Sequence, residues 1–277
     1  MTWTTVIAAD ALARLVASEA VTLFDCRFDL FDPTAGRRAY AAGHLPGATF
    51  LDLEADLSGR PGGRNGRHPL PDRASLAARL AAAGVRRGGQ VVAYDDAGGA
   101  FAARAWWLLR WLGHHAVAVL DGGVQAWVAD GQPLLSGEVV PAPGDFLAAE
   151  RPAMPVAKAE SLTGAVTIID ARAPDRFRGA PHPLDPVAGH IPGARNRFFR
   201  DNLQADGRFR PIATLTEEYR ALLGNERPDA AIVYCGSGVT ATHDLLAMHH
   251  AGLPGAALYA GSWSEWISDP RRPIAQD

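Results

Sequence analysis

Cysteine is scarce in this chain, which holds only Cys26 and Cys235 among its 277 residues. The two cysteines are far apart and form no C-x-x-C pair, so a zinc site built from cysteine alone is excluded. A single bridge between them is not expected in a reducing compartment, and we therefore expect two free thiols. The surroundings of each cysteine must therefore decide which of the two thiols is reactive.

Long apolar runs and a large excess of one charge are also lacking. No apolar run approaches the roughly 20 residues that span a bilayer, and the N-terminus "MTWTTVIAADALARL" shows no basic start followed by an apolar core. The formal charge of -3 gives no reason to expect nucleic acid or a membrane as a partner. With 48% hydrophobic and 21% charged residues, the chain has the composition of a soluble globular protein, and we expect a cytoplasmic location.

What the sequence does contain is a repeat of its own motifs. Four motifs recur in the same order, at differences in residue number between 139 and 146: "FDCR" with "IDAR", "AGHLPGA" with "AGHIPGA", "VVAYDD" with "AIVYCG", and "LDGGVQAW" with "YAGSWSEW". A constant order at a nearly constant spacing indicates a duplicated domain. We place the first copy at residues 1–132, a Pro- and Gly-rich linker at 133–155, and the second copy at 156–277.

Each copy alternates short apolar runs with helical stretches. The runs are "VTLFD", "VVAYD" and "AVAVL" in the first copy and "VTIID", "AIVYC" and "AALYA" in the second; the helical stretches include residues 73–83, 100–112 and 214–223. Strands that alternate with helices predict an α/β fold in which a parallel sheet is flanked by helices, here in tandem copies.

The repeat provides an internal control for the thiol. Where the first copy carries Asp95 in "YDDAGGAFAAR", the second carries Cys235 in "YCGSGVTATHD". Ligand sites of open α/β sheets lie at the carboxyl ends of strands, which is where both residues fall. A thiol needed only for packing would more naturally be replaced by Ala, Val or Ser than by Asp. The exchange favours a reactive Cys235 over a buried structural thiol.

The glycine-rich loop after Cys235 admits other interpretations. Gly236, Gly238 and Ala241 fit the dinucleotide spacing G-x-G-x-x-A, but the next strand "AALYAG" lacks the acidic residue that this fold requires at its end. A cysteine phosphatase needs C-x5-R, and the position of that arginine is Ala241. There remains a curl of backbone N–H groups at a helix N-terminus, which stabilises an anion such as a thiolate or a persulfide.

These motifs resemble the two-domain rhodanese family of sulfurtransferases, over about residues 21–266. The resemblance implies that the first copy, with Asp95, is inactive and that Cys235 cycles through a persulfide. The loop of Gly236, Ser237, Gly238, Val239 and Thr240 is similar to that of the 3-mercaptopyruvate branch; it lacks the basic residues that suit thiosulfate. Ser237 is then expected to hydrogen-bond the donor's carbonyl oxygen.

The same resemblance implies an arginine for the donor after the "DAR" strand. Arg176 in "DRFRG" matches it, and Arg178 is expected to assist. The family's second arginine is missing, because the chain has Leu184 near that position, so thiosulfate stays an alternative donor. His44 in "AGHLPGA" is a candidate for a proton relay, although His190 in the second copy favours a role in shaping the turn.

These residues predict a two-step sulfur transfer with ping-pong kinetics and no metal or organic cofactor. The Cys235 thiolate takes sulfur from 3-mercaptopyruvate or thiosulfate and passes it to cyanide, a small thiol or a thioredoxin-type dithiol. The alternative of another class is a non-catalytic persulfide carrier or sulfur-sensing module. Since Arg176 supplies a donor site that a carrier does not need, the sequence favours an enzyme, and we expect a monomer.

Overall fold

The chain divides into two compact units in the computed structural model, which describes residues 2–18, 20–162 and 166–276. The first unit comprises Met1–Ser58, Pro71–Ala153 and Gln204–Phe209, and the second comprises Gly59–Leu70, Met154–Leu203 and Arg210–Asp277. The sequence-based boundaries kept residues 59–70 with the first copy and 204–209 with the second. The terminal residues 1 and 277 of the predicted domains lie outside the described residues.

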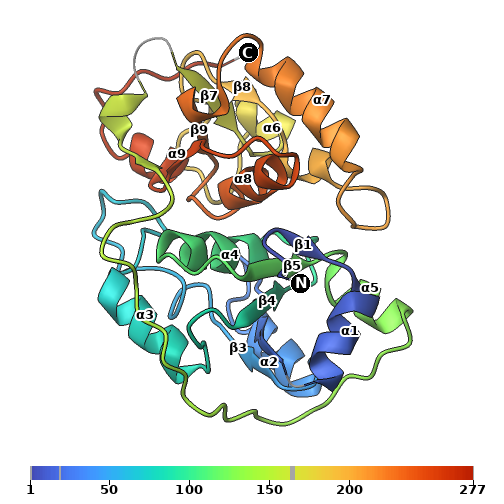
Figure 1. Cartoon of the computed structure of the whole chain (residues 1–277). Coiled ribbons are helices and arrows are strands. Elements are labelled where there is room, and N and C mark those ends of the chain that lie inside the picture. The colour runs from blue at the N-terminus through green and yellow to red at the C-terminus, as the bar shows by residue number, and fades with distance from the viewer. Residues whose placement is uncertain (1, 19, 163–165, 277) are drawn as a thin grey trace. The chain divides into compact units, whose positions relative to one another are not determined.

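The first unit is built on a five-stranded parallel sheet in the order β1-β5-β4-β2-β3, with its helices beside it (Figure 1). Its elements are β1 (Val6–Ile7), α1 (Ala9–Ala17), β2 (Val21–Asp25), α2 (Ala35–Ala42), β3 (Ala48–Phe50), α3 (Arg73–Ala82), β4 (Gln90–Tyr94), α4 (Ala102–Trp111), β5 (Val117–Leu120) and α5 (Gly123–Ala129).

The second unit repeats this plan in the order β6-β10-β9-β7-β8, again with parallel pairing. Its elements are β6 (Val156–Ala157), the 3-10 helix η1 (Ala159–Ser161), β7 (Thr167–Asp170), α6 (Pro174–Phe177), β8 (Arg195–Asn196), η2 (Phe199–Asn202), α7 (Ile212–Leu223), η3 (Pro228–Ala230), β9 (Ala231–Tyr234), α8 (Ala241–His250), β10 (Ala257–Tyr259) and α9 (Ser262–Trp266). The predicted α/β fold in two copies is confirmed.

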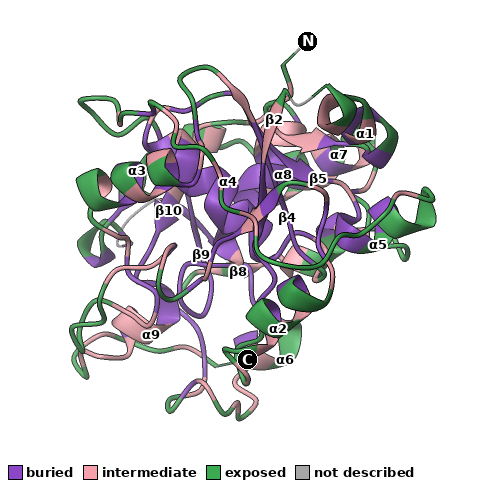
Figure 2. Cartoon of the chain, turned by 90° about the horizontal axis from the view of Figure 1, so that it is seen from below, coloured by how far each residue is buried: buried purple, intermediate pink, exposed green. Residues whose placement is uncertain are grey.

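The central strands are apolar because helices cover both faces of each parallel sheet. All four residues of β9 are buried, as are the last four of β4, and Figure 2 marks buried residues in purple. The second core gathers Ile168, Ile232, Tyr234 and Trp263. Burial of such side chains stabilises each sheet by about 1.5–3 kcal/mol per residue.

Two segments without regular secondary structure link helices and strands along the chain. Residues 141–153 lie along the first unit through backbone hydrogen bonds, including Gly144 N to Ala81 O at 2.7 Å and Ala149 N to Leu112 O at 2.7 Å. The second segment, Gly59–Leu70, is joined to the second unit. Of the helices in the part of the chain that the structure describes, none is both long and apolar enough to cross a membrane.

Candidate active site

The cysteine loop begins where β9 ends and runs into the N-terminus of α8. Gly238 has a φ of +80°, and a Cβ on it would lie 2.2 Å from the carbonyl oxygen of Ala260, so only glycine fits this curl. Two backbone bonds fix the other side of the loop, from Trp263 N to Cys235 O at 2.9 Å and from Ser264 N to Gly236 O at 3.0 Å. The carboxyl end of the strand and the start of α9 thus hold the thiol in place.

The thiol of Cys235 is 2% exposed and faces into the curl. The backbone N–H of Gly238 donates to Sγ at 3.1 Å, and the hydroxyl of Ser262 accepts from Cys235 N at 3.1 Å. With the N-terminus of α8 behind it, this arrangement favours negative charge on sulfur. The loop is therefore suited to a thiolate or to the longer anion of a persulfide.

The cysteine loop is contacted by a histidine that the sequence analysis did not predict. His68 Nδ1 lies 2.8 Å from Ser237 Oγ, and both side chains are buried, at 5% and 6% exposure. His68 comes from the segment Gly59–Leu70, which belongs to the second unit. Because either ring nitrogen can carry the proton, this pair can pass a proton between the imidazole and the serine hydroxyl.

Arginines gather around one buried carboxylate next to the loop. Asp185 accepts from Arg176 Nε at 3.0 Å and also pairs with Arg176 Nη2. Arg67 Nη1 lies 3.4 Å from Asp185 Oδ1, and Arg172 Nη1 lies 3.7 Å from Asp185 Oδ2. The guanidinium of Arg172 is held chiefly by Asp170, at 2.7 Å. Asp185 thus orients Arg176 beside Cys235.

The other two candidates from the sequence are Arg178 and His44. Arg178 is exposed, and since it lies two positions after Arg176 on a helical turn it faces another side. His44 belongs to the first unit, where Nδ1 bonds Tyr40 O at 2.9 Å and the ring stacks on that of Tyr40. His190 makes the same two contacts with Phe177 in the second unit. A role shared by both copies is that of shaping the turn.

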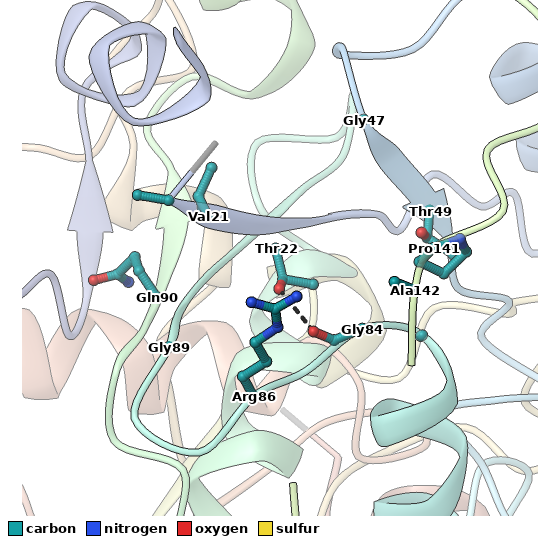
Figure 3. Close-up of a pocket in the computed structure, with 12 residues that line it drawn as sticks. Val21, Thr22, Gly47, Thr49, Gly84, Arg86, Gly89, Gln90, Pro141 and Ala142 are labelled. Carbon is teal, nitrogen blue, oxygen red and sulfur yellow. Dashed lines mark hydrogen bonds between the residues drawn. The ribbon is translucent and has the colours of Figure 1, made fainter. Parts of the chain in front are cut away.

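A cavity in the first unit lies at the wrong end of its sheet for such chemistry. About 360 Å³ in volume, it is lined by Val21, Thr22 and Gln90 at the amino ends of β2 and β4, with the side chain of Arg86 extending toward Thr22 (Figure 3). Thr22 Oγ1 donates to Gly84 O at 3.2 Å there. The lining has no thiol, and ligand sites of such sheets lie at the carboxyl ends.

With this geometry in view, the fold and the cysteine loop define a member of the rhodanese family. The family model described as "Rhodanese-like domain" matches residues 8–130 and 155–269, so the chain belongs to this family and carries the domain twice. The expected resemblance is confirmed.

Individual relatives cover nearly the whole chain. A protein of Pseudomonas aeruginosa named "Probable 3-mercaptopyruvate sulfurtransferase" is 51% identical over 97% of both chains. The thiosulfate sulfurtransferase of Mus musculus is 34% identical over 87% of this chain and 83% of its own. The structure of a 3-mercaptopyruvate sulfurtransferase from Leishmania major is 31% identical, with a TM-score of 0.86 over 98% of this chain and 75% of that one. All three are sulfurtransferases by name, which confirms the predicted class of enzyme.

Sequence reasoning found Cys235, its loop and Arg176 but missed His68 and Arg67. A signal for His68 existed. The segment "GRPGGRNGRHPL" holds a histidine, whereas the corresponding stretch of the second copy, residues 197–211, holds none. An asymmetry between copies marked Cys235, and the same comparison marks this segment.

Proposed function

We propose that this chain moves a sulfane sulfur from 3-mercaptopyruvate, through a persulfide on Cys235, to a thiol or cyanide acceptor. The observation that carries the proposal is the convergence of three features at one loop: the thiol of Cys235, the Ser237–His68 pair, and the guanidinium of Arg176. The names of the relatives with either donor support the reaction class.

In the first step the Cys235 thiolate attacks the sulfur of the donor. The new S–S bond forms as the donor's C–S bond breaks, and the electron pair of that bond passes to carbon as pyruvate enolate. The enolate takes up the thiol proton of the donor, which leaves pyruvate and an anionic persulfide. Ser237, hydrogen-bonded to His68, is suited to donate to the developing enolate oxygen and to relay this proton.

In the second step an acceptor thiolate or cyanide attacks the outer sulfur. The S–S bond to Cys235 breaks and its electron pair returns to the cysteine as thiolate, so no electrons enter or leave the cycle. The N–H of Gly238, at 3.1 Å from Sγ, supports the anion in both states. Arg176 binds the donor's carboxylate through its guanidinium, which Asp185 holds in place.

The first copy has no part in this cycle under the proposal, because Asp95 occupies its loop. A cytoplasmic location and a monomeric state, both suggested by the sequence, belong to the same proposal, and size-exclusion chromatography tests the second.

The experiment compares pyruvate release from 3-mercaptopyruvate with thiocyanate formation from thiosulfate and cyanide. It uses wild type, Cys235→Ser and Cys26→Ser, the last as a matched thiol control. We expect a strong preference for 3-mercaptopyruvate, no turnover by Cys235→Ser, and wild-type turnover by Cys26→Ser. A preference for thiosulfate would overturn the donor, and a stable persulfide on Cys235 without turnover would point to a carrier.

A further inference from the structure

Another cavity lies in the second unit, where β6 and β10 end. About 280 Å³ in volume, it is lined by residues that follow these two parallel strands, among them Lys158 after β6 and Gly261 after β10. Pro69 and Leu70, at the end of the segment Gly59–Leu70, also line it. Ligand sites of open α/β sheets lie at the carboxyl ends of strands, so this cavity has the position expected of a binding site.

Close backbone packing fixes the walls of this cavity. Ala260 and Gly261 line it, and the carbonyl oxygen of Ala260 packs on Gly238, where a Cβ would lie only 2.2 Å away. The carbonyl oxygen of Gly261 packs in the same way on Gly66, where a Cβ would lie 2.7 Å away. The cavity is therefore preformed, and a ligand that enters it does not have to order these walls.

The carboxylate of Glu265 lies at the wall formed by Gly261. Its Oε2 would be 1.5 Å from a Cβ on Gly261, and in the part of the chain that the structure describes no lysine or arginine forms an ion pair with it. Arg272 Nη1 donates to the backbone carbonyl of Glu265 instead, at 2.9 Å. Burial raises the pKa of Glu265, and the charge of Glu160, which also lines the cavity, raises it further against the opposing charge of Arg272. A cation bound between the two carboxylates would relieve their repulsion.

A buried hydroxyl next to Glu265 also lacks a partner. Tyr259 is 1% exposed, and its Oη makes no hydrogen bond of ordinary geometry to any residue within the described ranges. Burial raises the pKa of Tyr259, and the charge of Glu265 raises it further, so the hydroxyl keeps its proton. A buried donor in this state is rare in native proteins. It is a second polar group that a ligand at Glu265 is suited to satisfy.

The residues around the cavity define the chemistry of its ligand. An ammonium group suits Glu160 and Glu265, because it donates to carboxylates and neutralises their charge. Lys158 is exposed and offers the opposite charge to a carboxylate. Apolar surface comes from Val156, which is 43% exposed, and from Leu70. A small molecule that combines an ammonium, a carboxylate and an apolar chain is a free α-amino acid.

From this arrangement we infer that the cavity at the ends of β6 and β10 binds a free α-amino acid with an apolar side chain. Glu160 and Glu265 hold its ammonium group, and Lys158 holds its carboxylate. The site is separate from Cys235, and its ligand takes no part in sulfur transfer. The inference thus goes beyond the proposed function and does not depend on it.

Isothermal titration calorimetry tests this site with L-methionine, a thioether that offers no thiol to the enzyme. Two further probes each lack one charge: 3-(methylthio)propylamine lacks the carboxylate, and 4-(methylthio)butanoate lacks the amine. Glu265→Gln is expected to weaken the binding of L-methionine about 10-fold or more, because an ionised partner of the ammonium is lost. Glu217→Gln, an exposed change on α7, is expected to bind like wild type.

Lys158→Ala provides an independent test, because Lys158 is exposed and its loss does not disturb the core. This variant is expected to bind L-methionine about 3- to 10-fold more weakly and the amine probe as tightly as wild type does. No binding of L-methionine by wild type at millimolar concentrations would overturn the inference, as would wild-type affinity in both Glu265→Gln and Lys158→Ala. Cys235→Ser is expected to bind L-methionine like wild type. Wild type that binds L-methionine but releases no pyruvate from 3-mercaptopyruvate would refute the proposed function alone.

Discussion

The loop after β4 and the loop after β9 follow strands at the same place in the two sheets, but the first surrounds the carboxylate of Asp95 and the second surrounds the thiol of Cys235. In the first copy the Asp95 carboxylate accepts four backbone bonds: from Ala97 and Gly99 to Oδ1 at 2.9 and 2.8 Å, and from Phe101 and Ala102 to Oδ2, both at 2.8 Å. In the second, Sγ of Cys235 accepts from Gly238. One loop is filled by a carboxylate that accepts four backbone N–H groups, whereas the other holds a thiol that accepts one.

The frame around the two loops is shared. Arg27 binds Asp25 and the carbonyl of Gly43 in the first copy, at 2.7 Å for the latter, and Arg172 binds Asp170 and Gly189 O in the second, the latter at 2.8 Å. The carbonyl of Asp95 accepts from Val124 N at 3.0 Å, just as that of Cys235 accepts from Trp263 N. Conserved geometry in both copies thus belongs to the fold.

The residues of the proposed reaction lie at the positions that differ. Arg176 corresponds by the repeat to Phe31, which is 68% exposed in the first copy. The comparison teaches that positions at which the two copies differ are the first candidates for functional residues. Each prediction below changes one of the differences.

The largest effect is expected from Cys235→Asp, which gives the second loop the residue that the first loop has at Asp95. Turnover of 3-mercaptopyruvate should fall by at least about 10³-fold, as for loss of a covalent nucleophile. The thermal unfolding midpoint should not fall, because the loop N–H groups can bind the new carboxylate as they bind Asp95. Steady-state kinetics and calorimetry measure both; a variant that unfolds at a much lower temperature would show that the loops are not equivalent.

Arg176→Ala should lower kcat/KM for 3-mercaptopyruvate by about 100-fold, because the donor's carboxylate loses a charged partner. Phe31→Ala is the matched change in the first copy and should leave kcat/KM at the wild-type value. Parallel kinetic assays of the two variants decide the matter. Equal losses in both would contradict a donor site confined to the second copy.

Asp95→Ala should affect stability far more than turnover. It leaves four backbone N–H groups without their acceptor, three of them in buried hydrogen bonds, and should lower the free energy of unfolding by about 3 kcal/mol. Urea denaturation measures this loss, with the exposed Asp10→Ala as control. Folded Asp95→Ala protein should keep kcat/KM within about twofold of wild type; a catalytic defect in the folded variant would give the first copy a role in the reaction.

Cys26→Ala should have the smallest effect. Burial raises the pKa of the Cys26 thiol well above its usual range, and the charges of Asp25 and Asp95 raise it further, so the group stays protonated and unreactive. The second copy already has Ala171 at this position. Kinetics with 3-mercaptopyruvate should match wild type, and a marked loss of activity would show that Cys26 contributes to sulfur transfer.

The sequence predicted the central strands and long helices well. The runs it marked coincide with β2, β4, β5, β7, β9 and β10, and residues 73–83 became α3 (Arg73–Ala82). It did not predict the edge strands β1, β3, β6 and β8, because two or three residues are too few for a periodic pattern.

The candidate site was predictable where it is local. Cys235 and Arg176 each follow a strand and lie within a recognisable motif, whereas His68 lies 169 positions from Ser237, the residue that it contacts. Only tertiary packing of residues 59–70 against the second unit joins them. The family resemblance made His44 a candidate for a proton relay, whereas its contact with Tyr40, which His190 repeats with Phe177, is that of a residue that shapes the turn.

The most direct test of the account is the site of sulfur loading. Wild-type protein is treated with 3-mercaptopyruvate without an acceptor, digested, and analysed by mass spectrometry. The account predicts one added sulfur atom on the peptide that contains Cys235, none on that of Cys26, and none on either in Cys235→Ser. Sulfur on Cys26, or pyruvate release with no sulfur on Cys235, would contradict it.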